Sequence, residues 1–224
     1  MKDLYVFHVS SKRLSDIRPL ALQKGRTRYK HEIKELIGEA RYETHKYEIS
    51  AFLEPPKQSD IDRLITAGFT PWINNGLFVH KINLDDNIDN IISIKITSHP
   101  EQHKFMDKYW SKWYKKHKHL NNDDFYKAKR ELDKQMAVET GIPDCMSLEE
   151  FKILASEKDW YGFSEFVTLN VEKGSKEQYA TYIPHVYVAV KKPLTIEEVT
   201  EITGVNREVY HASYANNFVN MKNT

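Results

Sequence analysis

The sequence contains a single cysteine, and this scarcity excludes one common way of stabilising a fold. Cys145 has no second cysteine with which to form an internal disulfide. Proteins that depend on disulfides are made in oxidising compartments. The sequence therefore predicts a protein of a reducing compartment, which is the cytoplasm, or the host cytoplasm or the virion if the protein is viral.

Long hydrophobic runs are also missing. The chain has no apolar stretch of the ~18 residues that a membrane helix needs, and we expect no signal sequence because Met-Lys-Asp-Leu-Tyr at its start lacks an apolar core. We therefore expect no membrane partner. Hydrophobic residues make up 40% of the 224 residues, which is enough for the core of one large domain.

An excess of one charge is absent as well. The 33 Lys and Arg residues are balanced by 32 Asp and Glu residues, which gives a net charge of +1. Such a chain is not a general polyanion binder, and any basic patch must be local.

No complete catalytic or metal-binding motif occurs. His99 and His103 are four residues apart, but Pro100 disfavours helical geometry at His99, which a shared metal would require. The pair Ser10-Ser11 lacks the context of a nucleophile elbow. We therefore predict no metal and no resident cofactor, and whether the protein is an enzyme stays open.

Strand patterns occupy both terminal thirds of the chain. They are rich in aromatic and β-branched residues and are bounded by turn residues. We expect strands over residues 4–10, 47–53, 77–84, 92–97, 160–169 and 178–190, and an edge strand over 205–214. The apolar density of Ile183 to Val190 favours a strand covered on both faces, at the centre of the sheet.

Helical patterns dominate the middle of the chain. We expect helices over residues 29–44, 60–67, 101–139 in two pieces, 147–157 and 195–204. The last two begin with capping-box patterns, Ser147 with Glu150 and Thr195 with Glu198.

The order of these segments predicts a single α+β domain. A mixed or antiparallel sheet is built from both terminal thirds, residues 1–99 and 158–215, and a helical insertion occupies 100–157. Residues 216–224 form a flexible tail.

The helical middle combines aromatic and basic residues. Residues 101–135 contain ten Lys and Arg against six Asp and Glu, and the pairs Tyr109/Trp113 and Trp110/Tyr114 are spaced four apart. This spacing suits packing against a core or a partner protein. Nucleic acid is the weaker alternative, because cations and aromatics also bind phosphates and bases.

Two histidines, His8 and His185, lie near the ends of expected inner strands. The simplest interpretation is a core histidine with a hydrogen-bond partner. Alternatively, the two meet in a cleft that holds a phosphorylated or nucleotide ligand. Candidate groups for such a cleft are Lys12, Arg13, Arg26, Arg28, Glu165, Gln178 and Tyr182.

The opening strand, with His8 followed by a small polar residue, resembles the first motif of ADP-ribosyltransferases over residues 4–13. In that family the strand histidine holds the nicotinamide-side ribose, so the resemblance implies NAD as cofactor. For the family's tyrosine motif and catalytic glutamate it offers only Tyr47 and Glu165, with Gln178 as a substitute.

Three functions follow from these patterns, in order of preference. The first is a non-enzymatic binding or assembly protein, of viral or phage structural or accessory type, that contacts other subunits, including its own copies. The second is a nucleotide- or NAD-using transferase with a cleft between His8 and His185. The third is a nucleic-acid binder that uses the basic helices of residues 104–134.

Overall fold

The computed structural model describes the parts of the chain on which all structural statements below rest. They are residues 3–10, 12–23, 31, 34–35, 38–56, 77–96, 99–156, 165–169, 178–182 and 185–202. From 165 to 185 only the backbone is described.

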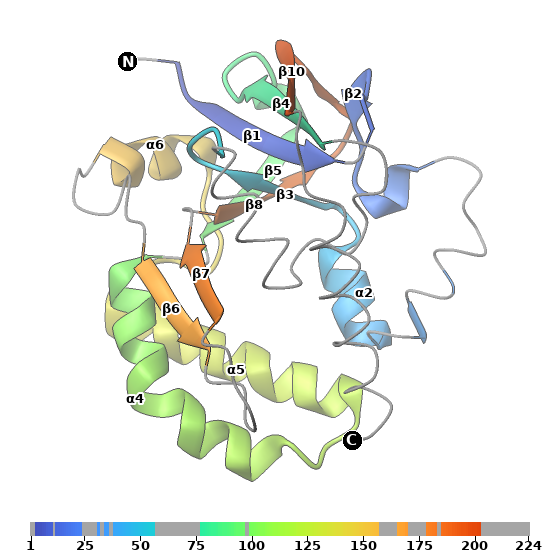
Figure 1. The fold of residues 1–224 in the computed structure, drawn as a ribbon. Coiled ribbons are helices and arrows are strands. Elements are labelled where there is room, and N and C mark those ends of the chain that lie inside the picture. The colour runs from blue at the N-terminus through green and yellow to red at the C-terminus, as the bar shows by residue number, and fades with distance from the viewer. Residues whose placement is uncertain are drawn as a thin grey trace.

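A six-stranded antiparallel sheet, in the order β10-β4-β1-β3-β8-β5, forms the centre of the protein (Figure 1). Its strands are β1 (Tyr5–Ser10), β3 (Glu48–Phe52), β4 (Leu77–Asn83), β5 (Ile91–Ile96), β8 (His185–Val190) and β10 (Glu198–Ile202). Strands from the two ends of the chain thus share one sheet. This confirms the α+β class and the sheet built from both terminal thirds.

One face of the sheet carries the main hydrophobic core. Side chains alternate between the two faces of a strand, and Val6, Ala51 and Val188 are fully buried on this face. Helix α6 (Leu148–Ser156) contributes Phe151, which is also fully buried. The predicted capping box of this helix is confirmed, because Ser147 and Glu150 exchange backbone-to-side-chain hydrogen bonds.

Two short strands and two short 3-10 helices lie between the longer elements in the described part of the chain. They are β2 (Asp16–Ile17), β9 (Leu194–Thr195), η1 (Leu20–Leu22) and η2 (Ile88–Asn90). Strands β2 and β9 pair with each other, which buries Ile17 and Leu194 in the main core. A separate antiparallel pair is formed by β6 (Glu165–Leu169) and β7 (Gln178–Tyr182).

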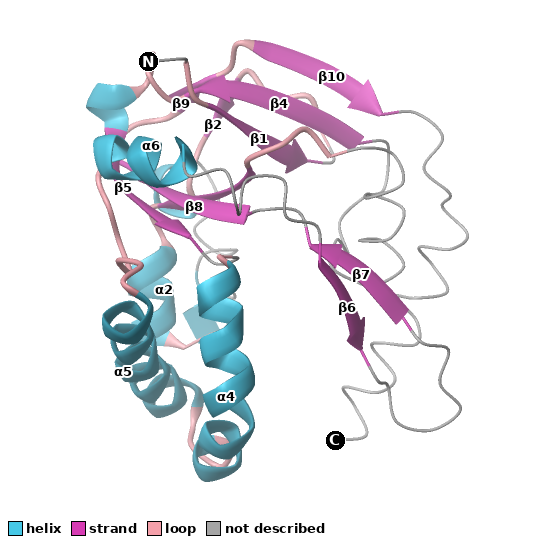
Figure 2. Cartoon of the chain, turned by 90° about the vertical axis from the view of Figure 1, so that its left-hand side faces the viewer, coloured by secondary structure: helices cyan, strands magenta, loops and turns pink. Residues whose placement is uncertain are grey.

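Two long helices extend from the sheet as an antiparallel pair (Figure 2). Helix α4 (Pro100–His117) begins with proline at its first position, and the His99 ring accepts a hydrogen bond from the Glu101 N–H. Helix α5 (Asn122–Thr140) ends at Gly141, whose φ of 72° suits glycine. The shorter helix α2 (Glu39–His45) packs against α5. None of the helices in the described part of the chain is long and apolar enough to cross a membrane.

Two expectations from the sequence are wrong. The helix over 195–204 does not form: residues 198–202 are strand β10, which pairs along its length with β4. The β-branched residues Val199, Thr200 and Ile202 favour a strand at the sheet edge over a helix. The expected strand over 178–190 is two elements, since β7 pairs with β6 and only β8 joins the main sheet.

The strand expected at the centre of the sheet, β8, lies one position from its edge, between β3 and β5, while β1 and β3 occupy the middle. Of the helix expected over 29–44, the structure shows α2 and helical residues at 31 and 34–35. The expected elements at 60–67 and 205–214, and the tail at 216–224, lie outside the described residues.

Candidate functional site

A pocket of about 600 Å³ opens at the C-terminal end of β1. The segment that follows β1 forms one wall, and the start of β3 forms the other. The polar residues that line it are His8, Ser10, Lys12, Ser15, Asp16, Arg18, Gln23, Glu48 and Ser50. Its volume falls within the range of small-molecule sites.

The wall formed by residues 12–23 is held at three points. The Leu14 N–H donates to His80 Nε2 at 3.0 Å, the Ala21 N–H donates to the Lys46 carbonyl at 2.8 Å, and Ile17 pairs with Leu194 of β9. The pocket is therefore built into the fold and is more than a gap between loops.

His8 is a half-buried pocket residue with one ring nitrogen already engaged. Its Nδ1 lies 2.8 Å from the Ser50 carbonyl oxygen. A carbonyl only accepts, so Nδ1 carries the proton and Nε2 carries the lone pair. Burial lowers the pKa of His8, with a smaller contribution from the nearby His80, so the neutral ring is favoured.

His80 is the histidine that the structure places beside His8. The two residues are direct partners across β1 and β4, with ring centroids 6.2 Å apart. His80 is fully buried: its Nδ1 donates to the His8 carbonyl at 3.2 Å, and its Nε2 accepts from the Leu14 N–H. Sequence reasoning missed His80, because its role depends on the register between two strands that pairs residues 72 positions apart.

The charges around the pocket are partly compensated. Arg18 forms two hydrogen bonds of 2.6 Å with the Asp16 carboxylate, which raises the pKa of Arg18 and lowers that of Asp16. Lys12 is exposed, and its ammonium forms no ion pair with any residue that the structure describes. Arg13 is exposed and does not line the pocket.

Gln23, at the end of the wall, has an incompletely paired side-chain amide. Its Nε2 donates a long hydrogen bond of 3.4 Å to the Arg18 carbonyl, while Oε1 is buried and unpaired within the described structure. A buried acceptor without a partner carries a free-energy cost of about 1–3 kcal/mol.

The structure does not bring position 185 to this pocket. Phe7 pairs with Phe52, and Phe52 pairs with His185, so these three positions share one face of the sheet. His8, one residue along from Phe7, lies on the other face. Glu165, Gln178 and Tyr182 are backbone positions in the separate β6–β7 pair, and Arg26 and Arg28 lie outside the described residues.

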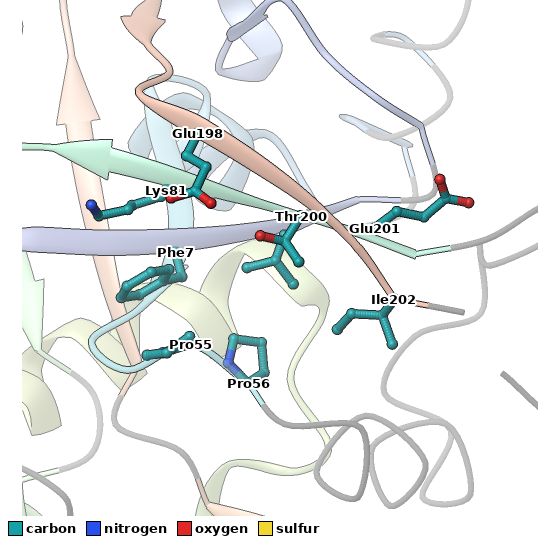
Figure 3. A pocket seen from close by; sticks show the side chains of 9 residues that line it. Phe7, Pro55, Pro56, Lys81, Glu198, Thr200, Glu201 and Ile202 are labelled. Atoms are coloured by element: carbon teal, nitrogen blue, oxygen red, sulfur yellow. The ribbon is translucent and has the colours of Figure 1, made fainter. Parts of the chain in front are cut away.

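A second hollow, of about 620 Å³, lies on the face of the sheet opposite the main core. Figure 3 shows Phe7 and Thr200 above Pro55 and Pro56, which follow β3. Lys81 lines it too, but its ammonium is paired with Glu197 at 2.7 Å and lies over the Tyr5 ring at 4.0 Å. The ammonium of Lys81 is thus engaged within the protein.

Of the four aromatic residues expected to bind a partner, Trp110, Trp113 and Tyr114 form one continuous cluster with Phe125. Trp110 stacks on Trp113 at 5.3 Å and on Tyr114 at 5.7 Å, and Phe125 of α5 packs edge-on against Trp113 at 5.2 Å. We call Trp110, Trp113, Tyr114 and Phe125 the aromatic row. Tyr109 lies apart from it, with its ring tilted against that of Phe105 and its hydroxyl donating to Glu139 of α5 at 3.0 Å.

The aromatic row stays outside the main core. That cluster includes no residue of α4 or α5 among those described. Trp110 and Trp113 are half-buried, and Tyr114 is 44% exposed. Beside the row, Lys112 and Lys116 are exposed and form no ion pair within the described part of the chain.

A polar cluster joins these helices to the sheet, and no motif in the sequence indicates it. His45, at the end of α2, has its Nδ1 in close contact with the Glu48 carboxylate of β3, and its Nε2 lies 2.7 Å from the Tyr126 hydroxyl of α5. The His45 ring also lies 6.2 Å from Tyr187 of β8. Burial raises the pKa of Tyr126, which keeps the phenol protonated.

Comparisons with protein-family models, curated protein sequences and solved structures return no match for this chain. Function must therefore be inferred from the chemistry of these sites.

Proposed function

We propose that this protein is a binding or assembly protein that contacts a partner protein through the α4–α5 helix pair. The observation that carries the proposal is the aromatic row, which lies on helices that contribute nothing to the described main core and which leaves Tyr114 44% exposed. Tryptophan and tyrosine are the side chains that most often dominate the binding energy of protein interfaces.

The charges beside the row indicate the chemistry of the partner surface. In the described structure, Lys112, Lys115 and Lys116 are exposed and unpaired, whereas Lys104 on the same helix is paired with Glu101 at 2.6 Å. An acidic protein surface with an apolar centre complements this arrangement. The partner can be another subunit or a second copy of this chain.

The near-neutral chain favours a protein partner over nucleic acid. A net charge of +1 supplies little of the long-range attraction on which nonspecific binding to a phosphate backbone depends. The rings of the row also stack on one another at 5.3–5.7 Å, so their faces are already used and are less available to bases.

The first test is site-specific crosslinking in cells that produce the protein. A photoreactive p-benzoylphenylalanine replaces Tyr114, and a control carries it at Ile153, which is 63% exposed on α6. We expect position 114 to yield a discrete protein adduct, this chain or another, which mass spectrometry identifies. The control position should not yield it.

Charge reversal then tests the surface with the identified partner. Lys112→Glu with Lys116→Glu should weaken binding at least ~10-fold, because the two cations would become repulsive anions. The matched control is Lys127→Glu with Lys134→Glu, two exposed lysines of α5 that are paired within their own helix. Equal effects of both double variants would overturn the proposal. Adducts that consist only of nucleic acid, with affinity falling steeply as salt rises, would replace it with the nucleic-acid function.

A further inference from the structure

The pocket at the end of β1 has the features of a small-molecule site that is independent of the helix surface. Its wall is anchored to β4, to β9 and to Lys46, and its volume of about 600 Å³ suits a ligand of metabolite size. We propose that it binds a sugar phosphate, either free or as part of a nucleotide, with His8, Gln23 and Lys12 as the recognising groups.

The histidine and the glutamine define the hydrogen-bonding half of the ligand. With His8 Nδ1 donating to the Ser50 carbonyl, Nε2 presents a lone pair and has no partner among the described residues. Gln23 Oε1 is a second unpaired acceptor, on an amide whose only described hydrogen bond is long. His8 and Gln23 both line the pocket, and two unpaired acceptors on its lining residues call for a ligand with several donors, which sugar hydroxyls supply.

Lys12 indicates that the other half of the ligand is an anion. Arg18 is held by both oxygens of Asp16 and brings little uncompensated charge, whereas the Lys12 ammonium is unpaired in the described structure. The Ser10 hydroxyl donates to the Lys12 carbonyl at 2.5 Å, which fixes the backbone that carries this lysine at the mouth of the pocket. A point charge of this kind binds a phosphate without demanding a fixed orientation.

The direct test is calorimetric titration of the full chain with ribose 5-phosphate, with ribose and inorganic phosphate as separate probes. We expect ribose 5-phosphate to bind at least ~10-fold more tightly than either half, because both sets of groups are then engaged. An AMP titration distinguishes the source: tighter binding than ribose 5-phosphate indicates a nucleotide, and equal binding indicates the free sugar phosphate. If none of the probes binds at 10 mM or phosphate binds as well as ribose 5-phosphate, the proposal is overturned.

Two variants separate binding from a structural role. Lys12→Met should weaken the binding of ribose 5-phosphate ~10-fold, because the cation for the phosphate is lost, and it should leave the binding of ribose unchanged. The control Lys104→Met on α4 should change the affinity for neither compound. Gln23→Met should weaken both sugars, and it should leave the melting temperature of the ligand-free protein equal or higher, because it removes an unpaired buried acceptor. A lower melting temperature with unchanged affinity would assign Gln23 to the fold and overturn its role in binding.

Discussion

His8 and His80 are adjacent histidines that the fold keeps neutral. Burial lowers the pKa of each below its ordinary value, and the hydrogen bonds they make to backbone carbonyls only partly oppose this. The unfolded chain therefore takes up protons at a higher pH than the folded one. The contribution of these two neutral rings to the free energy of unfolding should be fully present above pH ~6.5, the unfolded pKa of histidine. That contribution should be lost progressively as the pH falls below this value.

We expect His80→Gln to flatten this dependence. Glutamine offers a donor for the His8 carbonyl and an acceptor for the Leu14 N–H, but it does not titrate. In the wild type, His80 alone should contribute a slope of up to about 1.4 kcal/mol per pH unit below pH 6.5. Urea unfolding at pH 7.5, 6.5 and 5.5 measures both slopes, and identical slopes would show that His80 is not the titrating group.

Only some of the pocket residues could be predicted from the sequence. His8 and Lys12 could be predicted as candidates, because they occur together at the end of an obvious strand. His80 and Gln23 could not be predicted. The position of His80 beside His8 depends on the register between β1 and β4. The position of Gln23 depends on the pocket wall, which is held in place by pairing with β9, a strand close to the other end of the chain. His185 was paired with His8 on the basis of similar strand positions, yet their registers place them on opposite faces.

Gly38, which precedes α2, allows the start of this helix to lie close to α5. It has φ of 87°, and an added Cβ would lie 2.6 Å from Asp123 Oδ1. That oxygen accepts the Ala40 N–H at 3.0 Å and so caps the first turn of α2. Glycine is required here both for its backbone conformation and for the close approach of the two helices.

We expect Gly38→Ala to lower the free energy of unfolding by about 1–3 kcal/mol through backbone strain alone, with the contact to Asp123 adding to the loss. The matched control is Gly141→Ala, which also has positive φ but no atom within 4 Å of the added Cβ. Urea midpoints compare the two. An equal or larger loss at Gly141 would contradict the role assigned to the close approach.

Local signals predicted the helices better than the strands at the end of the chain. The pattern Ser147 with Glu150 forms its capping box, whereas Thr195 with Glu198 precedes a strand. The four-residue pattern is the same in both, but only residues 198–202 find a free strand edge on β4. A capping pattern is thus overridden where tertiary pairing is available, which a local reading of the sequence cannot detect.

For the whole molecule, the α+β class and the shared sheet followed from the order of the elements, but the strand order did not. Strand β1 lies between β4 and β3, so each main-sheet neighbour of β1 joins it only after a long loop closes. The helix pair was predicted as an insertion, and its connection to the sheet through His45, Glu48 and Tyr126 had no pattern in the sequence.

This arrangement leads us to expect that α4 and α5 open before the sheet does. The main core is built from the sheet, α6 and adjoining segments, and it includes no residue of α4 or α5 among those described. The described contacts of the helix pair to the rest include the hydrogen bond between Tyr126 and His45 and the packing of α5 against α2. Regions with few shared apolar contacts unfold at lower free energy than the global transition. Hydrogen exchange in increasing urea should release the amides of α5 at lower denaturant than those of β1 and β4.

The Tyr126→Phe variant tests whether the hydroxyl contact with His45 holds the helix pair against the sheet. We expect faster exchange in α5, by a factor of about 5 for a lost bond of ~1 kcal/mol, with exchange in β1 unchanged. Tyr114→Phe is the control, because the Tyr114 ring stacks on Trp110 and no hydrogen bond of its hydroxyl is seen among the described residues. If α5 and β1 lose protection together in the wild type, the helix pair and the sheet are one cooperative unit, and this division of the molecule is wrong.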